Sequence, residues 1–345
     1  METDLHIIRF SGMDDMDSIV DFLRKHWKKD HVLIKSPNLF RFQYTHYDKL
    51  NFAIAINKKS SEINGILGFI NYADAFDNSD IFSAIWKVEN KTGDIGLGIK
   101  LIEYFSSEIK YRSFTGSGAR IETLPIWKLL GYKTDKLKHY YILNTDISEY
   151  SIAVVPENYK MDSSAPKQDV CYDLTKINDF SHLMKVFSAE KYKDRKPYKE
   201  PWYINKRYFE YPFYKYGVYG INKNGQIESI LITRVVHANG AKILRIVDFI
   251  GIDEDLVGIS EGLNKLIYTH RYEYIDFYLY GIDDGILKKA GFLLRSDNDE
   301  ITLPYYFEPF KQENHDILFF STEKDKIYIF KGDGDQDRPN VLMDN

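Results

Sequence analysis

The sequence predicts an α+β protein with mixed sheets, arranged as two tandem units of similar layout. Three observations support this fold class. With 345 residues, the chain is long for one hydrophobic core and suits two domains of ordinary size. Apolar runs with strand character are interleaved with runs at helical spacing. The order of these runs in the first part of the chain recurs in the second part.

The first unit is expected to span residues 1–147. Its first strand is followed by a helix that Ser11 or Asp14 can cap, and its last helix has Pro125 in the first turn and Gly131 at the end. A polar turn between two apolar runs predicts a hairpin. The expected strands are 6–10, 52–56, 63–72, 82–89, 113–118 and 139–143, and the expected helices are one ending near 27, then 40–47, 99–109 and 123–132.

A linker is expected at 148–168, where Ser, Pro, Asp and Lys occur without periodicity. The second unit then spans 169–345. Its expected strands are 172–174, 216–221, 227–236, 243–250, 274–280 and 301–306, and its expected helices are 177–187, 257–268 and 286–292.

Two landmarks relate the units to each other. Gly131 matches Gly291, an offset of 291 − 131 = 160 residues, and Leu67 matches Leu231, an offset of 231 − 67 = 164 residues. The offsets agree within a few residues, which indicates a repeat at domain scale.

The strand at 82–89 leads into a loop that carries Gly93, Gly96 and Gly98, and a helical pattern starts directly after it. This layout aims backbone N–H groups and a helix N-terminus at a phosphate. Glycine suits such a loop because it adopts φ > 0 and lets a ligand approach the backbone. The spacing fits neither the P-loop, since no Gly-Lys-Ser/Thr follows, nor the dinucleotide fingerprint G-x-G-x-x-G.

The loop resembles the pyrophosphate loop of the GNAT superfamily of N-acetyltransferases, Q/R-x-x-G-x-G/A, with Gly96 and Gly98 as its glycines. Gly93 stands where Gln or Arg is usual. The segment 126–132 is similar to the family's F-Y-x-x-L-G-F segment, and the order of elements over residues 5–145 is the acetyltransferase order. The resemblance implies two tandem GNAT folds and acetyl-CoA as the co-substrate.

The resemblance also implies where the coenzyme binds. The backbone near Lys87 and Val88 would hold the pantetheine arm and the thioester carbonyl. The pyrophosphate would meet the loop amides of Asp94, Ile95, Gly96, Leu97, Gly98 and Ile99. The corresponding loop of the second unit carries Asp253, Glu254 and Asp255, whose charges would repel a pyrophosphate. The coenzyme is therefore expected in the first unit.

Acyl transfer from a thioester to an amine needs a base for the ammonium proton and donors for the oxyanion. Glu89, at the end of the strand that would hold the thioester, is the first candidate for this base, and a solvated strand-end carboxylate is the alternative interpretation. Glu122 is the second candidate. The Tyr that many members of the family use to protonate the thiolate falls at Trp127, and at Leu287 in the second unit, so that role is absent or is filled by another Tyr or a water.

The acceptor side is expected in the segment 201–211, where aromatic residues alternate with cations. Tyr203, Arg207 and Tyr208 suit a sugar or nucleotide-sugar acceptor, and a helix that packs the domains together is the alternative. Residues 331–340 resemble a Ca²⁺ loop loosely but lack the closing Glu of an EF-hand, so a solvated tail is expected. No metal site is expected, since no H-x-x-x-H pair occurs and Cys171 is the single cysteine.

The net charge of −5 and the pI of about 6.0 leave no basic field for nucleic acid, which is not an expected partner. No apolar run approaches the roughly 20 residues that span a bilayer, so no membrane span is expected. The N-terminus lacks the basic region of a signal peptide, which predicts a cytoplasmic protein. A small-molecule amine is the expected partner, and a homodimer is compatible with the sequence.

The sequence thus predicts an N-acyltransferase that moves acetyl from acetyl-CoA to an amine, with an amino sugar or nucleotide-linked amino sugar as the leading acceptor. The phrases at 137–144, 244–248 and 332–340 are similar to those of two-domain acetyltransferase-like proteins associated with bacterial surface-polysaccharide synthesis. One open alternative is an aminoacyl-tRNA-dependent transferase similar to the Fem-type peptidoglycan enzymes, against which the acidic pI and the retained loop stand. The other is a non-catalytic binding protein on a degenerate GNAT fold, which the missing Gln/Arg and Tyr support.

Overall fold

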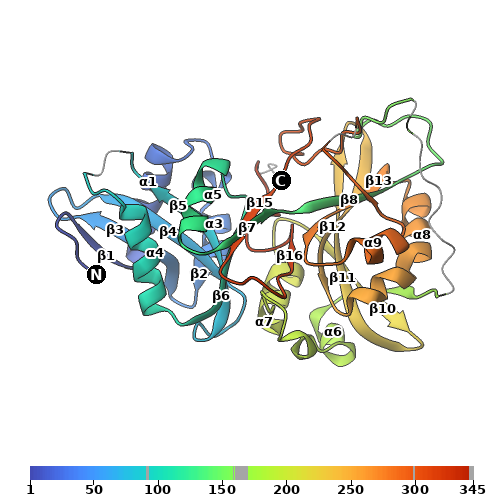
Figure 1. Cartoon of the computed structure of the whole chain (residues 1–345), viewed down its shortest axis with the longest axis horizontal. Coiled ribbons are helices and arrows are strands. Elements are labelled where there is room, and N and C mark those ends of the chain that lie inside the picture. Colours follow the sequence, from blue (N-terminus) through green and yellow to red (C-terminus); the bar gives the residue numbers. More distant parts are fainter. Residues whose placement is uncertain (91–92, 158, 160–169, 298–299, 342–345) are drawn as a thin grey trace.

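The computed structural model describes residues 1–345 except 91–92, 158, 160–169, 298–299 and 342–345. Two mixed sheets lie side by side, each with helices on both faces (Figure 1). The first sheet contains β1 (His6–Gly12), β2 (Thr45–His46), β3 (Lys49–Asn57), β4 (Ile63–Asn71), β5 (Ser79–Val88), β6 (Tyr111–Ser117), β7 (Lys133–Lys136) and β15 (Leu318–Ser321). The second contains β8 (Lys138–Leu143), β9 (Asp173–Ile177), β10 (Tyr216–Lys223), β11 (Gln226–Ala238), β12 (Ala241–Ile250), β13 (Tyr274–Tyr280), β14 (Leu293–Leu294) and β16 (Ile329–Phe330).

The helices are mostly short. The α-helices are α1 (Met16–His26), α2 (Val32–Lys35), α3 (Pro37–Tyr44), α4 (Leu97–Glu108), α5 (Leu124–Leu129), α6 (Phe180–Val186), α7 (Pro201–Ile204), α8 (Ser260–His270) and α9 (Asp284–Lys289). Single turns of 3-10 helix occupy Met13–Asp15, Ile121–Thr123 and Ala189–Tyr192, a longer one occupies Asp253–Ile259, and a π-helix at Asn205–Phe209 continues α7. Among the described residues, no helix is long and apolar enough to cross a membrane.

The two sheets share one strand order. The first runs β1-β3-β4-β5-β6-β15-β7 and the second runs β9-β10-β11-β12-β13-β8-β14. In each sheet the first three pairs of neighbouring strands are antiparallel, and the fourth pair is parallel. The parallel pairs are β5 with β6 and β12 with β13. The predicted mixed-sheet fold with two similar halves is therefore confirmed.

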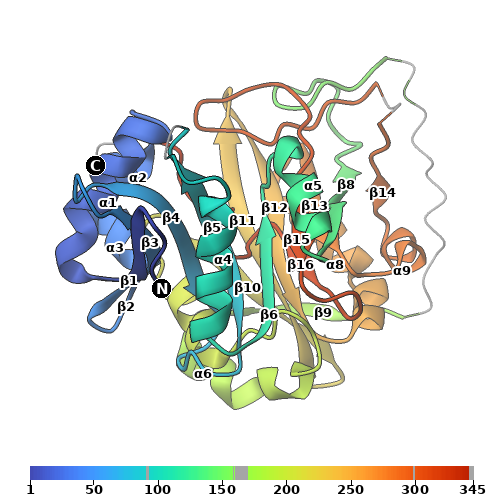
Figure 2. The same ribbon diagram turned by 60° about the vertical axis from the view of Figure 1, so that its left-hand side comes forward.

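Each half gives one strand to the other. β8 was expected to close the first unit, but it pairs with β13 and β14 of the second sheet. In exchange, β15 lies between β6 and β7 of the first sheet, which Figure 2 shows near α5. The strand expected at 301–306 is absent, because this segment forms only the bridge between Thr302 and Val154. An apolar strand pattern indicates a strand but does not show which strand it pairs with.

Both faces of the first sheet are buried. On one face, α4 packs on β1, β3, β4 and β5 through Leu97, Leu101 and Phe105. On the other face lie α1, α2 and α3, with Ile19, Leu33 and other apolar residues against the sheet (Figure 2). Because helices cover both faces, the central strands read as continuous apolar runs, as in residues 52–56.

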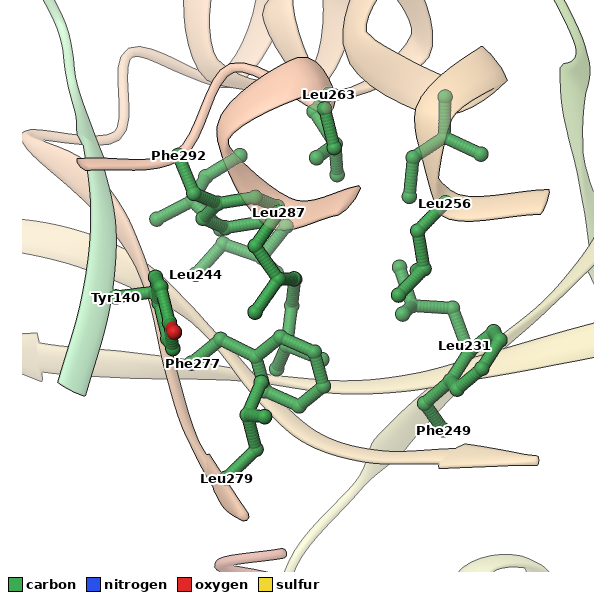
Figure 3. Packing of buried hydrophobic residues seen from close by; sticks show 14 of the residues in the cluster. Tyr140, Leu231, Leu244, Phe249, Leu256, Leu263, Phe277, Leu279, Leu287 and Phe292 are labelled. Carbon is green, nitrogen blue, oxygen red and sulfur yellow. The ribbon is translucent and has the colours of Figure 1, made fainter. Parts of the chain in front are cut away.

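The second sheet is covered in the same way. On one face, α8 and α9 place Leu263 and Leu287 against Leu244 and Phe277, and Figure 3 shows this core. On the other face, α6 and α7 pack on β9, β10 and β11. Part of the expected linker also packs, since Ile152 is buried against the second sheet and Glu273 accepts its backbone N–H. Residues 158 and 160–168 of that linker lie outside the described residues.

The expectation of a solvated tail at 331–340 is wrong. The tail, as we call these residues, runs between the two halves, and the side chains of Asp333, Asp335 and Asp337 are each only 1% exposed. Its polar composition is typical of a solvated segment, but here the charges are paired inside the protein. Burial of a carboxylate is tolerated when a cation and hydrogen bonds compensate it, and composition alone cannot show that compensation.

Candidate functional site

The strands β5 and β6 separate halfway along their length. Their parallel pairing ends where Phe82 meets Thr115, while the opposite edge of β6 stays paired with β15 through Gly116 and Ser117. A β-bulge lies at the same place, because Ile85 pairs with Gly68 and Ser83 with Phe69, which leaves Ala84 without a partner in β4. A bulge bends a strand and re-aims its side chains. The result is an opening between two strands of a continuous sheet.

The glycine loop, residues 93–98, follows β5 and leads into α4. Gly96 is the N-cap of α4 with φ of +82°, in the left-handed region that favours glycine, and a Cβ there would meet no atom within 4 Å. Among the described residues, no side chain caps this helix. The Leu97 N–H donates to the Asp94 carbonyl at 3.3 Å, and the N–H groups of Gly98 and Ile99 in the same turn can bind an anion, whose charge the helix dipole favours.

The predicted coenzyme residues occupy different environments. Lys87 and Val88 are half-buried at the end of β5, and Ile95 is 99% exposed at the tip of the loop. Leu97 belongs to the core and contributes only its backbone to the surface. Asp94 is held by Lys100 at 2.5 Å and by Thr3 at 3.0 Å, so its carboxylate is largely neutralised beside the loop.

Trp86 fills the space beside Gly98 and Ile99. Its indole N–H donates to the carbonyl of Gly98 at 3.1 Å, and a Cβ at Gly98 would lie 2.8 Å from its ring. Only glycine therefore fits at position 98 while the ring stays in place. The Trp86 ring contacts Trp127, which stacks on Phe320 with a centroid distance of 3.6 Å.

The opening between β5 and β6 faces a cavity of about 520 Å³ between the two halves, which we call the chamber. Its volume lies in the range of about 300–1,000 Å³ typical of small-molecule sites. Ala84, Ser117 and Gly118 line it from the first sheet, Arg234 and Arg245 from the second, and Lys331 and residues 335–338 from the tail. The remaining lining residues are Trp27, Lys28, His31, Arg120, Tyr214, Tyr305, Tyr306, Phe307, Glu308, His315, Ile317 and Asn340.

The arginines of the chamber hold the tail and the second sheet together. Arg234 forms a bidentate pair with Asp337 at 2.7 and 2.9 Å. Arg245 binds Asp276 at 2.7 Å and donates to the carbonyl groups of Pro304 and Tyr305. Burial alone would raise the pKa of Asp337, but Arg234 and nearby cations outweigh it and keep that pKa below its ordinary value.

His31 lies at the edge of the chamber and is only 7% exposed. Burial, and then the charges of Arg338 and Lys28, lower the pKa of His31 to about 3. The imidazole is therefore neutral at physiological pH. Its Nδ1 accepts the backbone N–H of Leu33 and caps α2, and its Nε2 lies 3.0 Å from the Arg338 guanidinium.

The two predicted bases do not line the chamber. Glu89 accepts a hydrogen bond from the Asn64 amide at 2.6 Å, and it lies five residues beyond Ala84, about 16 Å along an extended strand. It is thus at the loop end of the opening. Glu122 is exposed in the turn that precedes α5. The structure does not bring these two carboxylates together at one site.

The residues predicted for the acceptor side hold the tail. Tyr203 accepts the backbone N–H of Gly334, and Tyr208 donates to Asp248. Arg207 donates to the carbonyl groups of Gly332 and Asp337. All three side chains are buried, and none of them lines the chamber. The structure therefore places them behind the tail, as in the alternative interpretation of a packing segment.

Sequence reasoning missed the tail as part of the site. A usable signal was present, because Gly332 and Gly334 alternate with aspartates at positions where the chain passes close to other groups. A Cβ at Gly334 would lie 2.1 Å from the Phe82 ring, and one at Gly332 would lie 2.7 Å from the Val247 carbonyl oxygen. Glycines that alternate with polar residues can thus indicate a segment that passes close to other parts of the chain.

A sheet of this strand order, opened beside a bulge and followed by a glycine loop and a helix, is the GNAT fold, and the chain contains it in two halves. Among solved structures, a GCN5-related N-acetyltransferase from Anabaena variabilis is similar over 92% of this chain and 72% of its own, with 12% identity and a TM-score of 0.54. A conserved Enterococcus faecalis protein of unknown function, described as a probable N-acyltransferase, is similar over 92% and 71%, with 11% identity and a TM-score of 0.53. No protein-family model and no curated protein matches the sequence. At this identity the likeness shows the fold.

Among the described residues, no group of three or more His, Cys, Asp or Glu side chains is arranged to hold a metal ion. The single cysteine, Cys171, is exposed and donates to Glu261.

Proposed function

We propose that the protein is an acyl-CoA-dependent N-acyltransferase with acetyl-CoA as the donor. The observation that carries this proposal is the alignment of three features along β5: the uncapped start of α4, the opening at Ala84, and the chamber beyond it. Val88, at the loop end of β5, and Ala84, in the middle of the strand beside the chamber, are about 13 Å apart along the strand. An extended arm anchored at the loop can therefore reach the chamber along this strand.

In this proposal the backbone N–H groups of residues 94–99 bind the pyrophosphate, and the backbone near Lys87 and Val88 guides the pantetheine arm. The amine nitrogen of the acceptor then attacks the thioester carbon, the C–S bond breaks, and the thiolate takes up a proton as coenzyme A leaves. The proton of the acceptor ammonium goes to a base. Glu89 and Glu122 remain the candidates that the sequence proposes, and the chamber adds His315 on its rim.

The acceptor is proposed to be a small-molecule amine bound in the chamber, with a nucleotide-linked amino sugar as the leading class. The chamber is large enough for a ligand of this kind. The rings of Tyr305 and Tyr306 and the hydroxyl of Ser117 offer the mixed apolar and polar contacts that a sugar requires. As part of the same proposal, the protein acts in the cytoplasm in polysaccharide synthesis and forms a homodimer.

Calorimetric titration of the full-length protein with acetyl-CoA tests the donor. We expect micromolar binding that is weakened at least tenfold by Gly98→Leu, because a side chain there displaces Trp86 and covers the loop amides. Glu103→Leu is the matched control, since Glu103 is an exposed position on the same helix. Release of the coenzyme A thiol in the presence of amines then tests the transfer. Absence of acetyl-CoA binding in the unaltered protein would refute the proposal.

The second candidate function is that of a non-catalytic binding protein. It is favoured by Trp127, which stands where the resemblance places a Tyr and is almost fully buried against Phe320. Its indole ring has no hydroxyl to give to a thiolate. Binding of acetyl-CoA without release of thiol, over a panel of amines and amino sugars, would favour this candidate.

A further inference from the structure

The cations that line the chamber fall into two groups. Arg234, Arg245 and Arg338 are committed to the structure, because they bind Asp337, Asp276 and the backbone carbonyl of Asp335, respectively. The other three are Lys28, Arg120 and Lys331, and none of them has an ion-pair partner among the carboxylates of the described residues. The chamber therefore has cationic side chains that the fold does not use.

Lys331 is the most informative of these cations. Its side chain is only 3% exposed, yet it borders the chamber. Its ammonium group makes one hydrogen bond, to the backbone carbonyl of Gln336 at 3.2 Å, and lies 3.8 Å from the centre of the Tyr305 ring. A lysine ammonium has three donors, so two remain without a protein acceptor among the described residues. Burial of an ammonium in this state is costly unless an anion compensates it.

The surroundings of Lys331 increase this cost. Burial, together with the charges of Arg245 and Arg234, lowers the pKa of Lys331 well below its ordinary value, although Asp337 and Asp276 act in the opposite direction. The lining contains six cations (Lys28, Arg120, Arg234, Arg245, Lys331 and Arg338) and three carboxylates (Glu308, Asp335 and Asp337). Arg245 is paired with Asp276, which lies outside the lining, so an excess of two positive charges remains. A dianion in the chamber would balance this excess and accept hydrogen bonds from the free donors.

Lys331 is also close to the opening in the first sheet. The residue whose carbonyl it contacts, Gln336, has its side chain against Gly118, which directly follows β6. An anion at Lys331 would therefore lie beside the place where the acyl group arrives, with Arg120 two residues beyond Gly118 on the rim. This places the anion on the acceptor, on the side of the opening away from the glycine loop.

We propose that the chamber is a binding site for a phosphate group of the acceptor, with Lys331 as its buried contact and Arg120 and Lys28 as contacts at the rim. The assignment of this ligand as the acceptor rests on the proposed acyltransferase function. The site itself does not, because it is defined by the residues of the tail and of the segment after β6. The chemical class is a phosphate ester or a nucleoside diphosphate, whose oxygens accept several charge-assisted hydrogen bonds.

The test is a calorimetric titration of the full-length protein with inorganic phosphate, with uridine diphosphate and with acetate, each with and without saturating coenzyme A. Coenzyme A occupies the glycine loop, so the remaining binding reports the chamber. We expect uridine diphosphate to bind in the presence of coenzyme A and Lys331→Met to weaken it about tenfold or more. Arg120→Met should weaken it about threefold, in line with an exposed charge. Arg24→Met, an exposed arginine paired with Asp21, is the control and should change nothing.

Each outcome decides between the two proposals. If uridine diphosphate binds in a way that depends on Lys331 and Arg120, and coenzyme A does not bind, the phosphate-site proposal is supported and the acyltransferase proposal is refuted. If coenzyme A binds but uridine diphosphate does not bind beside it, or binds equally well to both variants, only the phosphate-site proposal is refuted. Tighter binding of acetate than of phosphate also overturns it, in favour of a carboxylate. If circular dichroism shows that Lys331→Met does not fold, the effect of the exposed Arg120→Met variant on uridine diphosphate binding tests the phosphate site instead.

Discussion

The glycine loop of the first half and its counterpart in the second half have the same place in the sheet order but opposite structures. In the first half, Gly96 starts α4 with open space around it, and Ile95 is exposed. In the second half, residues 253–259 form a 3-10 helix whose Leu256 and Ile259 are fully buried. One loop presents backbone N–H groups to solvent, and the other has become part of the core.

The acidic residues of the second loop explain how it is closed. Asp255 accepts hydrogen bonds from Lys223 at 2.8 Å and from Ser229 at 2.6 Å, and Asp253 binds Arg195 at 2.6 Å. Gly258 lies against Tyr172, because a Cβ there would be 2.2 Å from the ring. The sequence indicated repulsion of a pyrophosphate by these acids; the structure adds that the space itself is filled. Two halves with the same strand order can thus differ at one loop, which is open before α4 and packed into the core at residues 253–259.

The largest effect is expected from the buried carboxylate of the closed loop. Asp255→Ala leaves the Ser229 hydroxyl and the Lys223 ammonium without their partner, and should lower the free energy of unfolding by about 3 kcal/mol. The matched control is Glu254→Ala, at the exposed neighbouring position, with a change within about 0.5 kcal/mol. Urea unfolding measures both. A loss below 1 kcal/mol for Asp255→Ala, or a gain of acetyl-CoA binding, would show that this loop is not closed by its acids.

The next effect concerns the response of the first half to acid, through His31. The pKa of His31 is lowered from 6.5 to about 3 in the folded protein, so between these values only the unfolded chain binds the proton. The stability that the neutral, buried His31 contributes is fully present above pH 6.5 and is lost as the pH falls toward 3. At pH 5 the loss amounts to about 2 kcal/mol.

His31→Asn keeps a side-chain acceptor for the N-cap of α2 and removes the titration. We expect this variant to lose about 2 kcal/mol less stability than the unaltered protein between pH 7 and pH 5. His237→Asn, at an exposed position in the second half, is the control and should show the same pH dependence as the unaltered protein. Denaturant unfolding at the two pH values gives the comparison, and parallel curves for all three proteins would contradict it.

The smallest effect is expected from changing one open glycine in each half, Gly96 in the glycine loop and Gly240 in a hairpin turn. Gly96 and Gly240 both have positive φ, +82° and +77°, and a Cβ at either would meet no atom within 4 Å. Each change to Ala should therefore cost the same, about 1 kcal/mol of stability, through backbone strain alone. Only Gly96→Ala should also weaken acetyl-CoA binding, since Gly240 lies in a hairpin turn of the second half. Equal effects of both variants on binding would argue against the glycine loop as the coenzyme site.

Much of the fold was predictable because it depends on local patterns. The hairpins, the strand before the glycine loop and the helix after it follow from apolar periodicity and glycine placement. The partners of β8 and β15 were not predictable, because strand exchange leaves the pattern of each strand unchanged. The candidate site was predictable only at its loop. The chamber is formed by residues as distant in sequence as Ala84 and Lys331, and no local pattern relates them.

The sequence by itself determined the mixed-sheet class, the two similar halves, and the presence of the glycine loop in one half only. These features are set by the spacing of apolar residues and glycines, which acts over a few residues of chain. Only the tertiary structure decided that residues 331–335 and Asp337 are buried between the halves and that Lys331 faces the chamber. The physical reason is that the burial of a charged segment depends on its compensating partners, and those partners, such as Arg234 for Asp337, come from distant strands.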